Sequence, residues 1–387
     1  MPTLVLPRAD GSTAPHRLGP ASRFSASGPP IGVRTVFAAA HVVMDPLASH
    51  DPWRAPVVDW EATLAFRHRL WGLGFKIAEA MDTAQRGMGL DWAGARELIR
   101  RSLTEARGVA GADLACGVGT DQLDPLAARN LDDVVAAYVE QFSHVEACGG
   151  RAILMASRAL CRLARSADDY LAVYSRLIEA AGDKVILHWL GDMFDPQLAG
   201  YWGSRDVATA MDTVVALIES QRGKIEGIKI SLLDQAHEET LRARLPAGVK
   251  MYTGDDFNFA ATIEGDGRRH SHGLLGIFDP IAPAAAAAFA RLEAGDVAGY
   301  RQILAPCVPL SRKMFETPTQ FYKAGVVFMA WLNGQQRHFR MLGGLESARG
   351  IVHYAELFRL ADAAGLIEDP DLATARMRAL LAAAGID

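Results

Sequence analysis

Short runs of apolar residues recur along the chain, and longer stretches with a helical period of apolar positions separate them. Such short runs are typical of strands buried on both faces, and the longer stretches are typical of amphipathic helices. Eight strands are predicted, over residues 33–40, 75–81, 113–117, 152–156, 184–189, 225–230, 249–253 and 273–278. Helices are predicted between them, over residues 60–71, 93–107, 131–147, 167–180, 207–221 and 237–244.

This alternation predicts an α/β protein with a parallel sheet, because parallel neighbours need a crossover connection that is usually a helix. Eight such units match a closed (β/α)₈ TIM barrel. An open sheet that binds a dinucleotide would carry a glycine-rich turn after its first strand, and the sequence AAAH at residues 38–41 is not one. We expect residues 1–30 to be an N-terminal extension, residues 31–290 to be the barrel and residues 291–387 to be a C-terminal helical extension.

Composition narrows the range of partners. The 387 residues are 50% hydrophobic and 22% charged, which is typical of a globular protein with a large core. The net charge of −5 and the scattered arginines argue against a nucleic-acid partner. The sequence contains no recognisable secretory signal and no apolar segment long enough for a bilayer, and its four cysteines have no CxxC spacing. We therefore expect a cytoplasmic protein with no membrane partner.

The chemistry of a TIM barrel takes place at the carboxyl ends of its strands, so polar residues there matter most. We assign to this edge His41, Glu79, Asp82, Thr83, Ser157, Arg158, His188, Lys229, Asp255 and Asp256, together with the pair His270 and His272.

Lys229 is the most informative of these residues, because it lies inside the apolar run IEGIKI at residues 225–230. Burial among neutral groups lowers the pKa of a lysine and exposes the free amine that can attack a carbonyl. The alternative is a lysine whose stem crosses the strand end while its ammonium reaches solvent or a carboxylate.

Three segments stand out for their order and spacing, namely VILHW, GIKIS and YTGDD at residues 185–189, 227–231 and 252–256. They resemble strands five, six and seven of the dihydrodipicolinate synthase and N-acetylneuraminate lyase superfamily. Weaker similarity is found at residues 74–86, 116–120 and 321–342, so the resemblance covers roughly residues 31–370 and marks a divergent, uncharacterised branch. It implies a class I aldolase-type lyase in which Lys229 forms a Schiff base.

The chain departs from the family pattern in ways that bear on mechanism. His188 stands where the family carries a tyrosine that relays protons, and an imidazole can do the same near neutral pH; the alternative is a packing residue. Thr83 matches a hydroxyl position in the strand-two segment, but Asp82 beside it argues against pyruvate as the donor. Asp82 or Asp255 would position hydroxyl groups or a charge.

Four further residues are expected to bind substrate. Glu79 would accept hydrogen bonds from sugar hydroxyls, Arg158 would bind an anionic or polyhydroxylated group, and Gly254 would let backbone approach a ligand. His272 joins this set. The alternatives are a buried ion pair for Glu79 and Asp82, a surface salt bridge for Arg158 and a helix cap for Asp255.

The leading hypothesis is a homo-oligomeric lyase or aldolase of carbohydrate metabolism. It would act on a small keto acid or a sugar-derived carbonyl compound through a covalent imine, without a cofactor. A second hypothesis is a divalent-metal-dependent lyase, isomerase or epimerase that uses Glu79, His188 and His272. A third is a barrel that binds sugars without catalysis.

Overall fold

The computed structural model of the chain describes residues 1–49 and 51–386, which form two compact units. The barrel unit comprises Arg34–Ala40 and Lys76–Leu275. The helical unit comprises Met1–Val33, His41–Phe75 and Gly276–Asp387. No helix in the described residues combines the length and the apolar composition that a bilayer-spanning segment requires.

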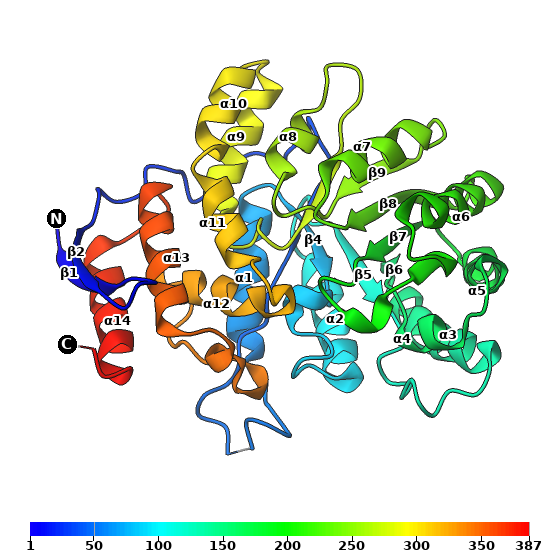
Figure 1. The fold of residues 1–387 in the computed structure, drawn as a ribbon, viewed down its shortest axis with the longest axis horizontal. Helices are drawn as coiled ribbons and strands as arrows, with labels where there is room; N and C mark the ends of the chain where they lie inside the picture. The colour runs from blue at the N-terminus through cyan, green and yellow to red at the C-terminus, as the bar shows by residue number, and fades with distance from the viewer. Residues whose placement is uncertain (50, 387) are drawn as a thin grey trace. The chain divides into compact units, whose positions relative to one another are not determined.

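Within the described residues of the barrel unit, eight parallel strands close into a ring (Figure 1). They are β3 (Val36–Ala39), β4 (Lys76–Glu79), β5 (Leu114–Val118), β6 (Arg151–Leu154), β7 (Val185–Leu190), β8 (Ile225–Ser231), β9 (Lys250–Thr253) and β10 (His272–Leu275), and β10 pairs with β3. Each predicted strand is present within a few residues of its expected bounds, so the predicted TIM barrel is confirmed.

Helices follow the strands in the chain. Those of the barrel unit are α2 (Trp92–Ala106), α3 (Leu131–Ala147), α4 (Arg158–Leu163), α5 (Ala167–Ala180), α6 (Val207–Gln221), α7 (Gln235–Arg244) and α8 (Phe259–Glu264). Several begin at a side-chain cap: Asp91 accepts from the Gly94 N–H at 2.8 Å, and Asp234 accepts from the His237 N–H at 2.9 Å. The short α4 and α8 were not predicted, because six residues are too few to show a helical period.

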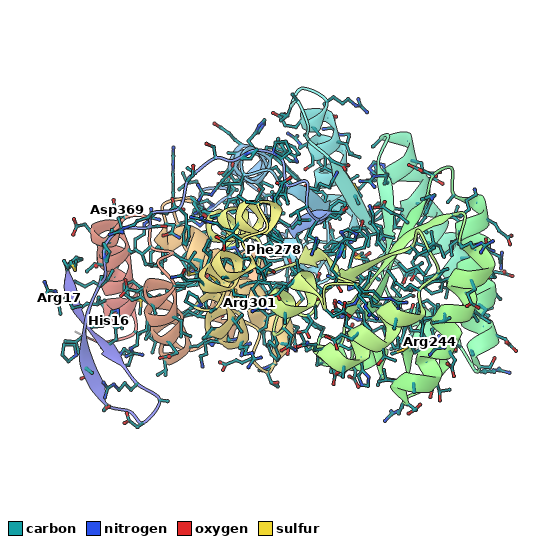
Figure 2. All side chains as sticks on the ribbon, turned by 90° about the horizontal axis from the view of Figure 1, so that it is seen from above. His16, Arg17, Arg244, Phe278, Arg301 and Asp369 are labelled. Atoms are coloured by element: carbon teal, nitrogen blue, oxygen red, sulfur yellow. The ribbon has the colours of Figure 1, made fainter. Side chains whose placement is uncertain are left out.

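The helical unit contains α1 (Trp60–Gly72), α9 (Ala282–Glu293), α10 (Val297–Leu304), α11 (Cys307–Met314), α12 (Tyr322–Leu332), α13 (Ile351–Ala363) and α14 (Pro370–Ala383). The predicted C-terminal helical region is therefore present. It also contains a hairpin of β1 (Thr3–Pro7) and β2 (Thr13–Arg17), which was not predicted. This hairpin packs on α13 and α14, and His16, labelled in Figure 2, lies 2.9 Å from the Asp362 carboxylate.

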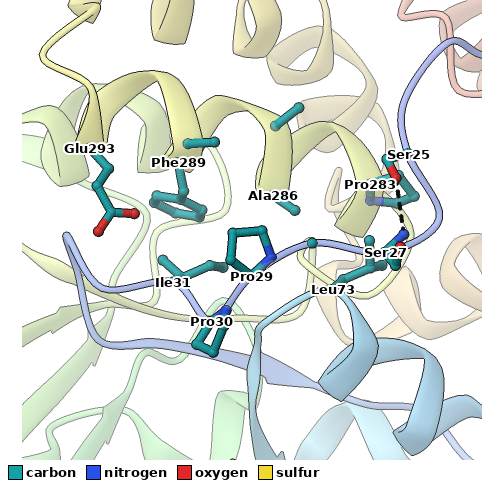
Figure 3. Close-up of a pocket in the computed structure, with 13 residues that line it drawn as sticks. Ser25, Ser27, Pro29, Pro30, Ile31, Leu73, Pro283, Ala286, Phe289 and Glu293 are labelled. Atoms are coloured by element: carbon teal, nitrogen blue, oxygen red, sulfur yellow. Dashed lines mark hydrogen bonds between the residues drawn. The ribbon is translucent and has the colours of Figure 1, made fainter.

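A small crevice of about 170 Å³ in the helical unit lies between residues 25–31 and α9 (Figure 3). The segment is held by two backbone hydrogen bonds, from Gly28 to Gly72 at 2.9 Å and from Ile31 to Gly74 at 3.2 Å. Most of the lining is apolar, so we interpret the crevice as a gap in the packing of this extended segment against α9.

The interior of the barrel is filled by apolar side chains from alternate strand positions, including Phe37, Ala78, Ala115, Ile153, Ile186, Tyr252 and Leu274. Side chains on a strand alternate between its two faces, so the residue two positions beyond an interior residue points the same way. His188 and Gly254 therefore continue the interior rows of Ile186 and Tyr252 toward the carboxyl ends of the strands.

Charged groups join the strands at the opposite, amino-terminal end. Arg151 at the start of β6 donates to Asp113 at 2.8 Å and to Glu226 at 2.6 Å. Glu226 also accepts from the Tyr252 hydroxyl at 2.6 Å and lies 3.3 Å from the Lys250 ammonium. The network ties β6, β8 and β9 together around the buried Tyr252 ring.

His272 lies at this amino-terminal end, and its assignment to the carboxyl edge was wrong. It is the first residue of β10, its Nδ1 accepts from the Thr35 N–H at 2.9 Å, and its ring packs 5.7 Å from Tyr252. His270 and His272 precede or begin the strand and do not follow it, so the strand places them far from its carboxyl end.

Glu238 on α7 is a buried carboxyl group behind β9. It is 1% exposed and accepts hydrogen bonds from the hydroxyls of Thr253 at 2.7 Å and Ser271 at 2.6 Å. Burial raises the pKa of Glu238 to about 7, although the two hydroxyl donors oppose the shift. The folded protein therefore holds a proton here that the unfolded chain releases at lower pH.

We predict that Glu238 makes the protein less stable as the pH rises. Because its folded pKa lies above the ordinary glutamate pKa of 4.5, its contribution to stability is unimpaired below pH 4.5 and declines until about pH 7. Glu238→Gln should remove roughly 2 kcal/mol of this loss between pH 5 and pH 8, measured by urea unfolding. Glu239→Gln, on the exposed side of the same helix, should keep the wild-type slope; equal slopes in all three proteins would contradict the prediction.

Candidate functional site

Lys229 and His188 face each other across neighbouring strands near the carboxyl end of the barrel. Lys229 lies on β8, the sixth strand counted from β3, and is 5% exposed. His188 lies on β7 directly opposite it in the strand register and is 2% exposed. Hydrogen-bonded strands are about 4.8 Å apart, so the two side chains share one interior corner of the barrel.

The effect of burial on the Lys229 amine is larger than the effect of the charges near it. Burial lowers its pKa, and the charges of Asp82 and Asp256 partly oppose that effect. Within the part of the chain that the structure describes, its Nζ makes no hydrogen bond and no ion pair closer than 4.0 Å. The amine is thus available in its neutral form at lower pH than an exposed lysine would be.

His188 is held by one nitrogen only. Its Nε2 lies 3.2 Å from the Ser231 hydroxyl, and its buried Nδ1 has no hydrogen-bond partner among the described residues. Burial and the nearby Lys229 lower the pKa of His188, so the imidazole is neutral at pH 7. A buried polar atom of this kind can form a hydrogen bond with a group that arrives from outside the protein.

Asp82 and Thr83 lie in the one-turn helix η1 (Asp82–Ala84) that follows β4. The chain reaches it through Ala80, whose φ of 53° is in the left-handed region that non-glycine residues rarely adopt. Arg86 fixes this bend by donating to the Ala80 carbonyl at 3.2 Å and by a bidentate bond to Asp121 at 3.0 and 2.9 Å. The loop thereby places the Asp82 charge within the electrostatic reach of both Lys229 and His188.

Gly254, just past β9, makes room for the lysine. A Cβ built at this position would lie 2.7 Å from Lys229 Cε, 2.1 Å from Ser231 Oγ and 2.7 Å from the Ile230 carbonyl oxygen. The Gly254 N–H donates to that same carbonyl at 2.8 Å, so the backbone has little freedom to withdraw. Gly254 therefore positions the lysine stem, whereas we expected it to approach a ligand.

The two aspartates that follow Gly254 have different environments. Asp255 accepts from the N–H groups of Phe257 and Asn258 at 2.9 and 3.1 Å, and from the Asn258 amide at 2.7 Å. It therefore stabilises the turn before α8 and is not the helix cap that was its alternative, because Asn258 occupies the N-cap position of α8. Asp256, 4% exposed, is the carboxylate whose charge acts on Lys229.

Two other expected substrate ligands do not join Lys229. Glu79 is next to the interior Ala78, so its side chain leaves β4 on the other face of the strand, and it accepts from the Ala80 N–H at 2.9 Å. Arg158 starts α4 with its side chain 45% exposed and donates to Asp195 at 2.5 Å. This is the surface salt bridge that the sequence left open.

The metal site imagined from Glu79, His188 and His272 is not formed. These residues lie, respectively, on the outer face of β4, inside the carboxyl end and at the amino-terminal end of the barrel. Across residues 1–49 and 51–386, no three His, Cys, Asp or Glu side chains are grouped closely enough to hold a metal ion.

Sequence reasoning missed one residue of the site, Ser231, and assigned Asp256 to this edge of the barrel without giving it a role. Ser231 lies two positions after Lys229 on the same strand, so the period-two alternation of β8 was a usable signal. No local pattern distinguishes Asp256 from Asp255, because the two carboxylates differ only in the hydrogen bonds that Asp255 makes within the turn after β9.

We predict that Gly254→Ala displaces the Lys229 side chain. The new methyl group would overlap a backbone oxygen that cannot move easily, so the loss in unfolding free energy should be about 1–3 kcal/mol. Denaturant unfolding measures it, with Gly223→Ala as the control, because a Cβ at Gly223 meets no atom within 4 Å. A Gly254→Ala protein as stable as the control variant would show that the close approach is absent.

Comparisons with known proteins agree with this architecture. YagE, a prophage protein of the dihydrodipicolinic acid synthase family from E. coli K12 in complex with pyruvate, is 14% identical, with a TM-score of 0.65 over 86% of this chain and 99% of that one. Dihydrodipicolinate synthase from Aquifex aeolicus is 13% identical, with a TM-score of 0.63 over 86% and 99%. The Bacillus clausii enzyme is 15% identical, with a TM-score of 0.60 over 86% and 98%.

These likenesses confirm the dihydrodipicolinate synthase-like fold that the three strand segments suggested. No curated protein matches the sequence. One family does match it, over residues 4–386, under the description "Protein of unknown function (DUF993)". Because that match spans nearly the whole chain, the protein belongs to the DUF993 family, here with a dihydrodipicolinate synthase-like barrel.

Proposed function

We propose that this protein is a class I aldolase-type lyase in which Lys229 forms an imine with a small carbonyl substrate. The observation that carries the proposal is the buried Lys229 amine, with its lowered pKa, opposite the neutral His188 on the next strand. Its place on the sixth barrel strand is also the place of the Schiff-base lysine in the superfamily that the sequence resembles. No dissociable cofactor takes part in this scheme.

The chemistry needs the amine and one proton carrier. The Nζ lone pair adds to the carbonyl carbon, and the carbonyl oxygen takes one proton from the nitrogen and one from solvent and leaves as water, which gives a protonated imine. When the C–C bond to the hydroxyl-bearing carbon breaks, its electron pair moves toward the imine and forms an enamine, while the hydroxyl group loses its proton to His188 and its fragment leaves as an aldehyde or ketone. A proton then returns to carbon, and water hydrolyses the imine and releases Lys229.

His188 is the proton carrier in this scheme. Its Nδ1 has no partner among the residues that the structure describes, so a substrate oxygen can occupy that position, while Nε2 stays bonded to Ser231 at 3.2 Å. A neutral imidazole can accept the proton that the carbinolamine releases and return it to the departing oxygen. Ser231 positions the ring and is not itself required to change protonation state.

The charges around Lys229 favour one class of carbonyl compound. Asp82 and Asp256 both act on the amine as negative charges, so a carboxylate beside the reacting carbonyl would be repelled. Hydroxyl groups would instead donate to these carboxylates, with Thr83 at the same loop as a further polar neighbour. We therefore favour a hydroxylated, sugar-derived aldehyde or ketone over an α-keto acid such as the pyruvate bound to YagE.

We predict that borohydride traps the imine on Lys229. Incubation with hydroxyaldehydes, sugars and keto acids, followed by reduction, should add the mass of the substrate less one oxygen to the peptide that contains Lys229. Lys229→Met should abolish the adduct, and Lys224→Met, outside the barrel interior, should not. Absence of the adduct across the panel, or its persistence in Lys229→Met, would contradict the proposal; a sugar that stabilises the protein without trapping would favour the non-catalytic alternative.

We predict that the pH dependence of trapping follows the amine. Because the folded pKa of Lys229 is lowered, the trapping rate should rise with pH and level off at a midpoint below 10.5. Asp82 stabilises the ammonium form, so Asp82→Asn should move the midpoint to still lower pH. Asp212→Asn, on the exposed face of α6, serves as the control; a shift to higher pH in Asp82→Asn would contradict this electrostatic assignment.

A further inference from the structure

A roomy cleft of about 520 Å³ opens at the amino-terminal end of the barrel unit, remote from the carboxyl-end position of Lys229. It lies between the end of α7, the turn that leads into β9, and the segment that leads into β10. Its volume is within the range of small-molecule sites, roughly 300–1,000 Å³. Leu245, Pro246 and Val249 form an apolar wall.

The remaining walls of this cleft are basic. Arg242, Lys250, Arg268, Arg269, His270 and His272 line it, and its lining contains no aspartate or glutamate. The chain as a whole has 45 acidic and 40 basic residues, so this concentration of one sign is not a consequence of composition.

Of the four lysine and arginine side chains that line the cleft, two have a carboxylate within 4.0 Å, and Arg268 and Arg269 have none among the described residues. The Arg242 guanidinium donates hydrogen bonds to the Thr262 carbonyl and the Ser271 hydroxyl, both at 3.1 Å. Its distance to the Glu239 carboxylate is 4.0 Å. Lys250 is paired with Glu226 at 3.3 Å. The Arg268 side chain makes no hydrogen bond or ion pair with any described residue.

The pKa values of the two histidines reflect the positive charges around the cleft. Burial lowers the pKa of both. Arg34 and Arg242 add to the shift at His270, and the neighbouring His270 ring, Lys250 and Arg34 add to it at His272. The pKa of His272 falls to about 3, so its ring is neutral at pH 7. Its Nδ1 accepts from Thr35, so its proton lies on Nε2 and can be donated.

We propose that this cleft binds a small organic molecule that carries a phosphate group. Guanidinium forks and an imidazole N–H match the acceptor oxygens of a phosphate, and the apolar wall accommodates the organic part of the molecule. The site is independent of the imine chemistry, because it lies at the other end of the barrel. Strand β9 joins the two regions, since it starts at Lys250 in the cleft and leads into Gly254 against Lys229.

Calorimetry with inorganic pyrophosphate on the full-length protein tests the site, at constant ionic strength set with chloride. Wild-type protein should bind one pyrophosphate, and the double variant Arg268→Gln/His270→Gln should bind it about tenfold more weakly. Ala247→Glu gives a second test, because it places a carboxylate on the rim without removing any existing bond. Arg244→Gln is the matched control: this arginine, labelled in Figure 2, lies at the same helix end, but it pairs with Asp212 and does not line the cleft.

Several outcomes would overturn the site. They are no binding by wild-type protein, equal affinity in wild type and both cleft variants, or an equal loss in Arg244→Gln. Loss of binding in Lys229→Met would also overturn it, by placing the anion at the carboxyl end. Retention in Lys229→Met, together with loss in the cleft variants, would support the site whether or not Lys229 forms an imine. Tighter binding of a single-stranded oligonucleotide, lost in the same variants, would replace the small-molecule proposal with a nucleic-acid surface.

Discussion

The desolvated amine of Lys229 is the constraint around which the carboxyl end of the barrel is built. An ammonium inside a packed strand is unfavourable unless charge or proton loss compensates for the lost water. The structure supplies both routes in part: two carboxylates are near enough to act on the amine, and no carboxylate of the described residues forms an ion pair with it. A lysine in this state can exchange between its two forms, which is the condition that covalent catalysis requires.

Several otherwise unrelated features of the sequence follow from that constraint. Gly254 lacks a side chain because the lysine stem passes within van der Waals distance of its backbone. The left-handed backbone of Ala80 and the buried Arg86 fix the loop that carries Asp82. Within residues 1–49 and 51–386, the buried Nδ1 of His188 has no hydrogen-bond partner. Together these features surround the Lys229 amine inside a well-packed interior.

The two ends of the barrel differ in how their charged groups are arranged. At the carboxyl end, burial lowers the pKa values of the Lys229 amine and the His188 imidazole, which favours their neutral forms. At the amino end, Arg151, Asp113 and Glu226 neutralise one another across the strands, while basic side chains collect around the neighbouring cleft. The first arrangement suits chemistry on a neutral or hydroxylated carbonyl compound, and the second suits an anion.

The sequence by itself determined the barrel and its key lysine. Strands buried on both faces must be continuous apolar runs, so all eight could be located, and a lysine within such a run was conspicuous for the same reason. The tertiary structure alone decided which polar residues meet it. The direction of β10 places His272 at the amino-terminal end of the barrel, and the alternation of side chains along β4 places Glu79 on the outer face. Asp256, and not Asp255, is the aspartate after β9 whose charge acts on Lys229. Arg158 pairs with Asp195 and does not join the site. These outcomes depend on the direction of single side chains and on partners far apart in the chain, which no local pattern of residues encodes.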